Sequence, residues 1–258
     1  MQFKAKNGVV IAAHRGNSKF LPENTLPAFQ SAIELGADML ETDIHITKDG
    51  ELVLMHDDDV KRMTGVSGRV CNMTFEEVRA LRVGNPALNL QVPTLKEFLD
   101  LCAPVKGLLL DLEIKVYSDA EGYKIMTETV DKTIALCNNY PLENRILFNC
   151  FDAAVLEYIY KNHGHRFLYH GYYPYREIMH NVTVEPEEYL DYACFWAGGE
   201  QAKQCCQTLL NQGVAPCSGS NTPEPVFFEL AGYGCAMFTE DNPKSALEWR
   251  NKLKPKEL

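Results

Sequence analysis

The sequence has no hydrophobic run long enough to cross a membrane. A helix that spans a bilayer needs roughly 20 consecutive apolar residues, and no stretch of the 258-residue chain approaches that length. The first ten residues also lack an apolar segment of the length found in signal peptides. We therefore expect a cytoplasmic protein with no stable membrane insertion.

Basic charge and paired cysteines are also scarce. Lys and Arg number 25 against 35 Asp and Glu, a net charge of −10, whereas proteins that bind nucleic acid usually present a basic face. We therefore expect no nucleic-acid partner, although a small anionic substrate can still bind where a site is locally positive. The nine cysteines include no CxxC pair, so their spacing favours neither a zinc site nor a disulfide framework.

Short apolar runs alternate with longer amphipathic stretches along the chain. Eight runs are expected to form strands: Val9–Ala13, Met39–Ile46, Leu108–Lys115, Arg145–Phe151, Arg166–His170, Tyr192–Trp196, Gly213–Cys217 and Cys235–Thr239. Stretches between them, such as Leu26–Leu35, Ala120–Cys137 and Ala153–Asn162, are expected to form helices. Alternating strands and helices indicate a parallel sheet, and eight such units in about 250 residues predict an α/β fold, the closed (β/α)8 or TIM barrel.

We expect a single domain over residues 1–258, with a small insertion after the second strand at about residues 57–93. This connection is longer than the roughly 2–6 residues usual for a βα loop, and it contains one short helical pattern at Thr74–Leu81. The insertion is expected to sit over one end of the barrel. Before it, the run Glu51–Met55 is expected to fold back on the second strand through a tight hairpin around Gly50.

Carboxylates cluster near the ends of the second and third predicted barrel strands. Residues two apart on a strand point to the same side, so Glu41 and Asp43 share a face, and Glu113 stands two residues before Lys115. Buried carboxylates repel each other unless a cation bridges them. Arg15 and Lys115 are candidate partners, but two cations are too few to neutralise the cluster. Three carboxylates at one barrel mouth therefore predict a site for a hard divalent cation.

Two histidines and an arginine are expected at the same barrel mouth. His14 ends the first strand, Arg15 follows it, and His56 follows the predicted hairpin. Isolated histidines are often structural, and the three aspartates at 57–59 beside His56 are expected to form a solvated turn. The alternative is functional: two histidines and an arginine at neighbouring strand ends suggest a metal-assisted site that handles phosphate, and the planar donors of Arg15 suit a phosphate.

Several short motifs stand at characteristic spacings between residues 9 and 243. They are His14-Arg15-Gly16, Pro22-Glu23-Asn24-Thr25, Ala28-Phe29, Gly36-Ala37-Asp38, Glu41-x-Asp43, Asp49-Gly50, His56-Asp57, Pro93-Thr94-Leu95, Glu113-x-Lys115 and Met237-Phe238-Thr239-Glu240-Asp241-Asn242-Pro243. In these motifs the sequence resembles the glycerophosphodiester phosphodiesterase family. The resemblance implies a TIM barrel with a small insertion after the second strand, and hydrolysis of glycerophosphodiesters to an alcohol and glycerol 3-phosphate.

The resemblance also implies roles for individual residues. One divalent cation, Mg²⁺ or Ca²⁺, would be held by Glu41, Asp43 and Glu113. The acid–base pair would be His14 and His56, and the phosphate would be bound by Arg15 and Lys115. A glycerol hydroxyl of the substrate would attack first, giving a cyclic phosphate that water then opens. Which histidine is the acid, the preferred head group and the oligomeric state are not readable from the sequence.

Two segments depart from the family pattern. An aromatic-polar motif on the seventh strand is replaced by Ala215 to Thr222, and Ser-Phe-Asp after the fourth strand reads Cys150-Phe151-Asp152. Both would line the pocket, so two alternatives are kept: a lysophospholipase D-like enzyme acting on lipid-like diesters, and a non-catalytic barrel that binds a phosphate ligand. The role of His45, on the face of Asp43, is open. The pair Phe195-Trp196 ends a strand; core packing is the preferred interpretation, and a place in the pocket wall is the alternative.

Overall fold

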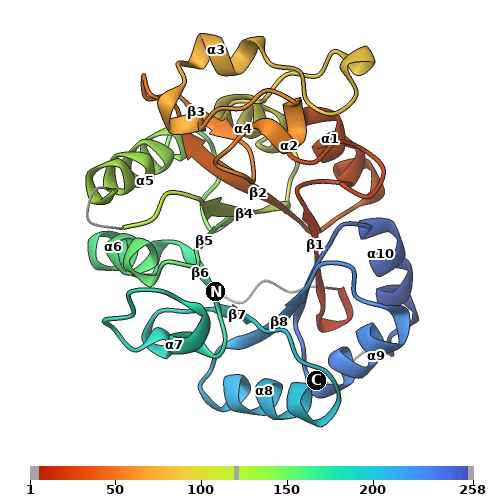
Figure 1. Cartoon of the computed structure of the whole chain (residues 1–258). Coiled ribbons are helices and arrows are strands. Elements are labelled where there is room, and N and C mark those ends of the chain that lie inside the picture. Colours follow the sequence, from red (N-terminus) through yellow and green to blue (C-terminus); the bar gives the residue numbers. More distant parts are fainter. Residues whose placement is uncertain (1–5, 119–121, 255–258) are drawn as a thin grey trace.

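Eight parallel strands close into a barrel at the centre of the molecule (Figure 1). The computed structural model describes residues 6–118 and 122–254. The ring follows the order β1-β2-β4-β5-β6-β7-β8-β9, and β9 pairs with β1 to close it. The barrel strands are β1 (Val10–His14), β2 (Met39–Ile46), β4 (Leu109–Ile114), β5 (Ile146–Asn149), β6 (Leu168–Tyr172), β7 (Tyr192–Cys194), β8 (Ala215–Gly219) and β9 (Met237–Glu240). The predicted (β/α)8 barrel is confirmed.

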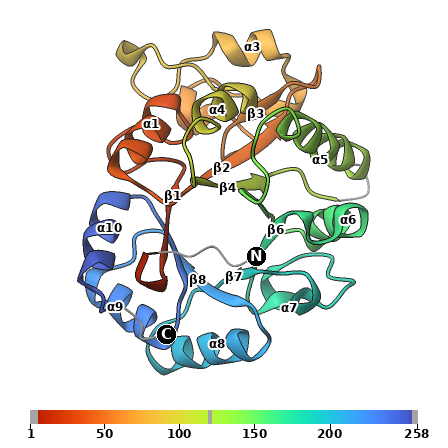
Figure 2. The same cartoon turned by 180° about the vertical axis from the view of Figure 1, so that it is seen from behind.

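Helices surround the barrel, as both the front view and the view from behind show (Figure 2). They are α1 (Leu26–Leu35), α2 (Lys61–Thr64), α3 (Phe75–Ala80), α4 (Leu95–Cys102), α5 (Tyr123–Cys137), α6 (Ala153–His163), α7 (Tyr175–Ile178), α8 (Gly199–Asn211), α9 (Glu224–Tyr233) and α10 (Pro243–Lys252). Short 3₁₀ helices occupy Lys6–Gly8, Val70–Asn72, Pro86–Leu88, Gly164–Arg166 and Pro186–Glu188. The predicted start of α5 at Ala120 lies outside the described residues. Among the helices described, none combines the length and apolarity needed to cross a membrane.

The barrel strands are buried on both sides, which explains their nearly continuous apolar sequences. All eight residues of β2 and all six of β4 are buried, because helices cover the outer face of a parallel barrel and side chains fill the inside. Between α1 and α4, for example, Phe29 packs edge-on against Phe98 with ring centroids 4.6 Å apart. Polar residues in these strands, such as Glu41, Asp43 and Glu113, are therefore costly exceptions.

The ends of several helices follow local sequence signals. Thr74 and Thr94 begin α3 and α4 with capping boxes, each with a glutamate three residues later that bonds back to the cap. Gly36 ends α1 in the left-handed conformation, with φ of 83°. Thr25 stands at the N-cap position of α1, but its side chain makes no capping bond. Its neighbour Asn24 is used elsewhere, in the site described below.

The insertion forms a small unit at the β2 side of the ring, with its own apolar cluster. The predicted hairpin is present: β3 (Leu52–Leu54) pairs antiparallel with β2. The cluster consists of Val53, Met55, Val60, Val70, Val78, Leu81, Val83 and Val92. Figure 1 places α2 and α3 outside the ring, beside β2 and β3. The insertion therefore lies beside the barrel mouth, whereas the sequence interpretation placed it over one end.

Candidate active site

Three carboxylates meet where the carboxyl ends of β2 and β4 lie side by side. The parallel register sets Asp43 opposite Glu113, and Glu41 lies two residues earlier on the same face of β2. One oxygen from each of the three carboxylates lies within 4.8 Å of the other two, and all three residues are buried. The position is the one where TIM barrels carry their active sites.

The protein neutralises this cluster only in part. Lys115 places Nζ 2.6 Å from Oε1 of Glu113 and 3.1 Å from Oδ1 of Asp43. On the other side, Arg15 places Nε 3.2 Å from Oδ2 of Asp43. These two cations outweigh the effect of burial and lower the pKa of Asp43. They do not neutralise the whole cluster, because none of the described ion pairs includes Glu41.

Glu41 is the carboxylate left most in need of a cation. Its Oε2 accepts a hydrogen bond of 2.9 Å from the backbone N–H of Arg15, while its Oε1 is buried and finds no hydrogen-bond partner among the described residues. Burial and repulsion from Asp43 and Glu113 hold the pKa of Glu41 well above its ordinary value. An unpartnered buried oxygen in an all-oxygen cluster fits a hard divalent ion, so these residues can hold a metal.

The loop after β1 holds Arg15 in a fixed position. Arg15 has a φ of 58°, in the left-handed region, and its guanidinium donates to Glu23 at 3.0 Å. Next to it, Gly16 has a φ of 83°, and a Cβ there would lie 2.6 Å from the backbone carbon of Ala28. Only glycine fits such a close approach. Asn24 completes the loop by donating to Oδ2 of Asp43 at 2.7 Å.

His14 is oriented by an aspartate from the last barrel strand's connection. Its Nδ1 lies 2.6 Å from Oδ1 of Asp241, whose other oxygen accepts a 2.7 Å hydrogen bond from Asn221. A carboxylate accepts only, so this contact assigns the hydrogen to Nδ1 of a neutral His14 and leaves Nε2 with its lone pair. The ring can then exchange a proton through Nε2.

His56 is held in the same manner from the insertion side. Its Nδ1 lies 2.7 Å from Oδ1 of Asp57, and Arg62 donates to Oδ2 of Asp57 at 2.5 Å and to Glu23 at 2.6 Å. Burial lowers the pKa of His56, which favours a neutral ring at pH 7. His45, whose role the sequence left open, lies 3.3 Å through Nε2 from the backbone oxygen of His56 and so supports the same turn.

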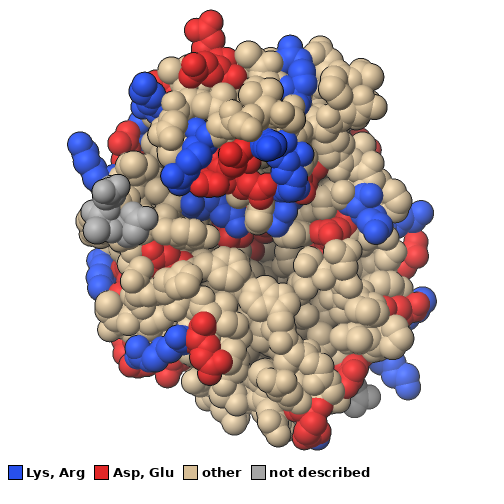
Figure 3. Space-filling view, viewed as in Figure 1, with Lys and Arg blue, Asp and Glu red and all other residues tan. Residues whose placement is uncertain are grey.

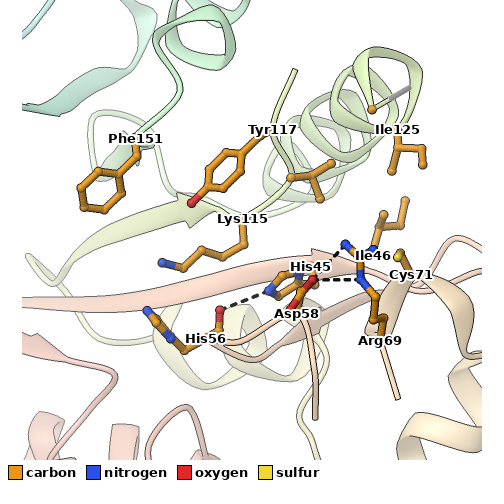
Figure 4. A pocket seen from close by; sticks show the side chains of 12 residues that line it. His45, Ile46, His56, Asp58, Arg69, Cys71, Lys115, Tyr117, Ile125 and Phe151 are labelled. Atoms are coloured by element: carbon orange, nitrogen blue, oxygen red, sulfur yellow. Dashed lines mark hydrogen bonds and ion pairs between the residues drawn. The ribbon is translucent and has the colours of Figure 1, made fainter. Parts of the chain in front are cut away.

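Two hollows adjoin the carboxylates. A cavity of about 70 Å³ is lined from all eight barrel strands or the segments after them: His14, Glu41, Glu113, Asn149, His170, Tyr172, Cys194, Trp196, Gly219, Ser220 and Thr239. A groove of about 600 Å³ runs between the insertion and the segment after β4 (Figure 4). Charged side chains gather around the hollowed middle of this face, towards the insertion (Figure 3). His14 borders the cavity, and His56 and Lys115 border the groove.

The structure brings all the predicted site residues to one barrel mouth. They are His14, Arg15, Glu41, Asp43, His56, Glu113 and Lys115. Two expectations were wrong. Asp57 is not in a plain solvated turn, because it bonds to His56 and Arg62. Trp196 is 55% exposed and lines the cavity, while Phe195 alone is core.

Sequence reasoning missed two residues that orient the site. Asp241 lies 227 residues from His14, so no local pattern links the two. Asn24 was interpreted as part of a helix start, whereas its side chain joins Thr42 and Asp43 on β2. The only available signal for either was its place in a motif shared with the resembling family.

Fold and site together define the class of this protein: a (β/α)8-barrel protein with a metal-competent acidic centre at its carboxyl-terminal mouth. The sequence profile of the glycerophosphoryl diester phosphodiesterase family matches residues 14–213. A match over more than half of the chain shows membership, and the chain belongs to this family. The family resemblance expected from the motifs is confirmed.

Individual relatives agree with this membership. The chain is 36% identical over 160 residues to a glycerophosphodiester phosphodiesterase of Caldanaerobacter subterraneus, covering 60% of this chain and 63% of the relative. It is 30% identical over 187 residues to the Bacillus altitudinis enzyme of the same name, covering 70% of each. An Oleispira antarctica phosphodiesterase, solved in complex with the product sn-glycerol-3-phosphate, superposes with a TM-score of 0.79 at 21% identity, covering 94% of this chain and 97% of that one.

Proposed function

We propose that this protein hydrolyses glycerophosphodiesters to an alcohol and glycerol 3-phosphate. The observation that carries the proposal is the grouping of three buried carboxylates, two cations and two carboxylate-bound histidines at one barrel mouth. Family membership supports the same reaction class. The Oleispira relative, whose structure holds sn-glycerol-3-phosphate, supports the identity of the product.

We propose Mg²⁺ or Ca²⁺ as the ion held by Glu41, Asp43 and Glu113. When bound, such an ion supplies positive charge that neutralises a phosphodiester and stabilises its transition state. Arg15 and Lys115 contribute further positive charge, and each forms ion pairs with two carboxylates. Against the effect of burial, these carboxylates raise the pKa of both residues, so both stay charged near neutral pH.

The two histidines are proposed to move protons during the reaction. One takes the proton of the attacking hydroxyl as its oxygen bonds to phosphorus, and the other gives a proton to the alcohol oxygen as its bond to phosphorus breaks. When a glycerol hydroxyl attacks, the product is a cyclic phosphate, and water then opens it with the two roles exchanged. His14 and His56 fit these roles because each has one ring nitrogen fixed by an aspartate.

Release of glycerol 3-phosphate tests the proposal. Glycerophosphocholine and glycerophosphoethanolamine are incubated with the protein in Mg²⁺, in Ca²⁺ and in EDTA. Metal-dependent release that is lost in Glu41→Ala, with that variant still folded, is the expected result. If folded wild-type protein releases nothing under any of these conditions, glycerophosphodiester hydrolysis is not its activity.

A second candidate substrate class is a lipid-like diester, cleaved as by a lysophospholipase D. The groove beside His56 favours it, since Ile46, Val116, Tyr117, Ile125 and Phe151 supply an apolar lining. Figure 4 shows Tyr117 and Phe151 along one side of this groove, facing the region of His56 and Lys115. Turnover of lysophosphatidylcholine above that of glycerophosphocholine would select this class, and the reverse order would exclude it.

We propose a single catalytic domain and a reducing, cytoplasmic location. The main apolar core joins strands and helices from Val9 to Leu247, which supports one cooperative unit. None of the nine cysteines, all of which lie in the described part of the chain, forms a disulfide, and seven of them are buried. Free thiols are typical of reducing compartments. A single unfolding transition and full activity in a reducing buffer are the expected outcomes.

A further inference from the structure

The segment after β4 directs a tyrosine towards the carboxylate cluster. Tyr117 follows Lys115 by two residues, and both line the groove of about 600 Å³ that His56 borders. Figure 4 shows the Tyr117 ring with its hydroxyl directed into the space between Phe151 and the side chain of Lys115. Tyr117 is 41% exposed and lines the groove, so a molecule in the groove can reach its hydroxyl. This hydroxyl has no role in the chemistry described so far.

Charged groups of the site act on this hydroxyl. Burial raises the pKa of Tyr117 to about 12, and repulsion from Glu113 acts in the same direction while Lys115 acts against it. The hydroxyl therefore keeps its proton near neutral pH and is a hydrogen-bond donor. Because such interactions weaken with distance, they also place the hydroxyl beside the residues proposed to hold the ion and the phosphate.

Tyr117 lies between two fixed points of the backbone. On one side, the backbone N–H of Lys115 donates to the carbonyl oxygen of Ile44 in β2 at 3.0 Å. On the other side, Ser118 donates both its backbone N–H and its hydroxyl to Oδ2 of Asp152, at 2.7 Å and 2.6 Å. The backbone of Tyr117 is thereby held from both directions, with its side chain in the groove.

Asp152 does more than begin a helix. It is 1% exposed, and its Oδ1 accepts from the backbone N–H of Ala154 at 3.1 Å, the usual capping bond at the start of α6. A cap needs only that oxygen, yet Oδ2 bonds Ser118, 34 residues earlier in the chain. Asn181, after β6, donates to Oδ1 of Asp152 at 3.1 Å and to Oγ of Ser118 at 3.2 Å. Asp152 therefore joins the segments that follow β4, β5 and β6 at the barrel mouth.

The position of the hydroxyl suits a contact with a phosphate. The hydroxyl and the ammonium group of Lys115 face the same part of the groove, and Lys115 is one of the two residues proposed to bind the phosphate. The non-bridging oxygens of a phosphodiester share a negative charge, and hydrogen bonds to charged acceptors are stronger than those to neutral ones. A tyrosine hydroxyl supplies such a bond without adding charge to a site that already contains Arg15 and Lys115.

We propose that the Tyr117 hydroxyl donates a hydrogen bond to a non-bridging oxygen of the substrate's phosphate. Asp152 is the positioning residue for this tyrosine and acts through Ser118. The proposal rests on the proposed function and adds a catalytic residue to it. Because the bond goes to the phosphate and not to the departing alcohol, its contribution does not depend on which alcohol leaves.

Binding of a phosphate ester tests the proposal without turnover. The dissociation constant of glycerol 3-phosphate is measured by calorimetry in Mg²⁺ or Ca²⁺ for wild-type protein and for Tyr117→Phe, which removes the hydroxyl and keeps the ring. We expect binding to weaken about tenfold, as the loss of one hydrogen bond to a charged group would give. The matched control is Tyr123→Phe, which should bind like wild type because Tyr123 is 54% exposed and lines neither hollow. Unchanged affinity in Tyr117→Phe, or no binding by wild-type protein, would overturn the proposal.

A comparison of two leaving groups shows which oxygen receives the bond. Glycerophosphocholine releases an alkoxide that needs a proton, whereas the p-nitrophenyl ester of glycerol 3-phosphate releases a stable phenolate. With a bond to the phosphate, Tyr117→Phe should be slower than wild type by a similar factor on both substrates. A loss confined to glycerophosphocholine would assign the bond to the departing oxygen and contradict the proposal.

A second variant tests the positioning by Asp152. Asparagine is as good a helix cap as aspartate, so Asp152→Asn can keep the bond to Ala154 while it places an amide NH₂ group against Ser118. The affinity for glycerol 3-phosphate should fall several-fold, and the double variant with Tyr117→Phe should bind no more weakly than Tyr117→Phe alone. Losses that multiply in the double variant would show that Asp152 does not act through the tyrosine.

The outcomes separate this proposal from the proposed reaction. Diester hydrolysis at equal rates in wild type and Tyr117→Phe would keep the reaction and remove the contact. Weaker binding of glycerol 3-phosphate to Tyr117→Phe, in a protein that cleaves no diester, would keep the contact and remove the reaction.

Discussion

Asp241 and Asp57 each bind the Nδ1 atom of one histidine, at 2.6 Å and 2.7 Å. Within the described part of the chain, the side-chain partners of Asp241 and Asp57 are His14, Asn221, His56 and Arg62, so their effect on any reaction passes through the rings they hold. A carboxylate in this position fixes the ring's tautomer and orientation and stabilises the ring when it gains a proton. The two histidines are thus oriented in the same way, one by an aspartate near the C-terminus and the other by an aspartate in the insertion.

The first prediction concerns this coupling. His14→Ala and His56→Ala should each lower turnover of glycerophosphocholine by about 10²- to 10⁴-fold, the usual value of an acid or base. Asp241→Ala should cause a smaller loss. The double variant His14→Ala/Asp241→Ala should be no slower than His14→Ala, because Asp241 acts through His14. Losses that multiply in the double variant would assign Asp241 an independent role, and wild-type turnover in both histidine variants would refute the acid–base assignment.

A second prediction concerns the contribution of the Arg62–Asp57 ion pair to stability in acid. The side-chain hydrogen bond from Arg62 is the main reason that the pKa of Asp57 falls to about 2. An acid with a lowered folded pKa stabilises the fold above its unfolded pKa, about 3.9, and that contribution disappears as the pH falls towards the folded value. Arg62→Met should therefore lower the free energy of unfolding by about 1 kcal/mol at pH 6, since the pair is partly exposed.

The difference between wild type and Arg62→Met should shrink as the pH is lowered from about 4 towards 2. Urea unfolding at a series of pH values measures it. Arg69→Met is the control, because Arg69 pairs with Asp58 where both side chains are more than half exposed. A gap that stays constant down to acid pH would show that Arg62 stabilises the protein by packing instead.

The loop from β1 to α1 carries specific backbone requirements. Arg15, Gly16 and Asn24 all have positive φ values, and the loop presents both a guanidinium and an amide to Asp43. The sequence suggested a strand end followed by a helix start at this place, which is correct. It did not predict that Asn24 would bond across to β2, because the same residue type is also common at helix starts.

The third prediction uses two glycines with the same backbone conformation. Gly16 and Gly36 both have a φ of 83°, but a Cβ at Gly16 would lie 2.6 Å from the backbone carbon of Ala28 in α1, whereas a Cβ at Gly36 would have no described atom within 4 Å. Gly36→Ala should cost about 1 kcal/mol for the left-handed backbone alone. Gly16→Ala should cost at least about 3 kcal/mol, since backbone atoms must also move. Equal losses in chemical denaturation would mean that the loop shifts freely.

The barrel as a whole was predictable because its signal is distributed over many elements. Alternating apolar runs and amphipathic helices need only be recognised as a pattern, and errors of one or two residues at each end do not alter it. The carboxylates and Lys115 were predictable for a related reason, since strand periodicity assigns them one face. Contacts such as that between His170 and Asp111 were not, because pairing across the inside of the ring depends on the final register.

A fourth prediction treats metal binding as a property of the whole fold. An ion that binds only the folded state should raise the melting temperature, by the equivalent of about 2.7 kcal/mol when the ion is at 100 times its dissociation constant. Mg²⁺ or Ca²⁺ should give this shift relative to EDTA in wild-type protein. Glu41→Gln should lose most of it, while the exposed control Glu76→Gln should retain it. An equal shift in both variants would argue against the Glu41 site.

The two halves of the chain contribute different residues to the barrel mouth, and this has a consequence for how such a protein can diversify. The residues proposed to hold the ion, the phosphate and the transferred protons all precede residue 118, while most of the cavity wall comes from residues 149–239. On these assignments, the residues proposed to react lie in the first half of the chain, and most residues that line the cavity lie in the second half. Recombination or drift in the second half can reshape the cavity beside His14, provided that Asp241 is kept for His14.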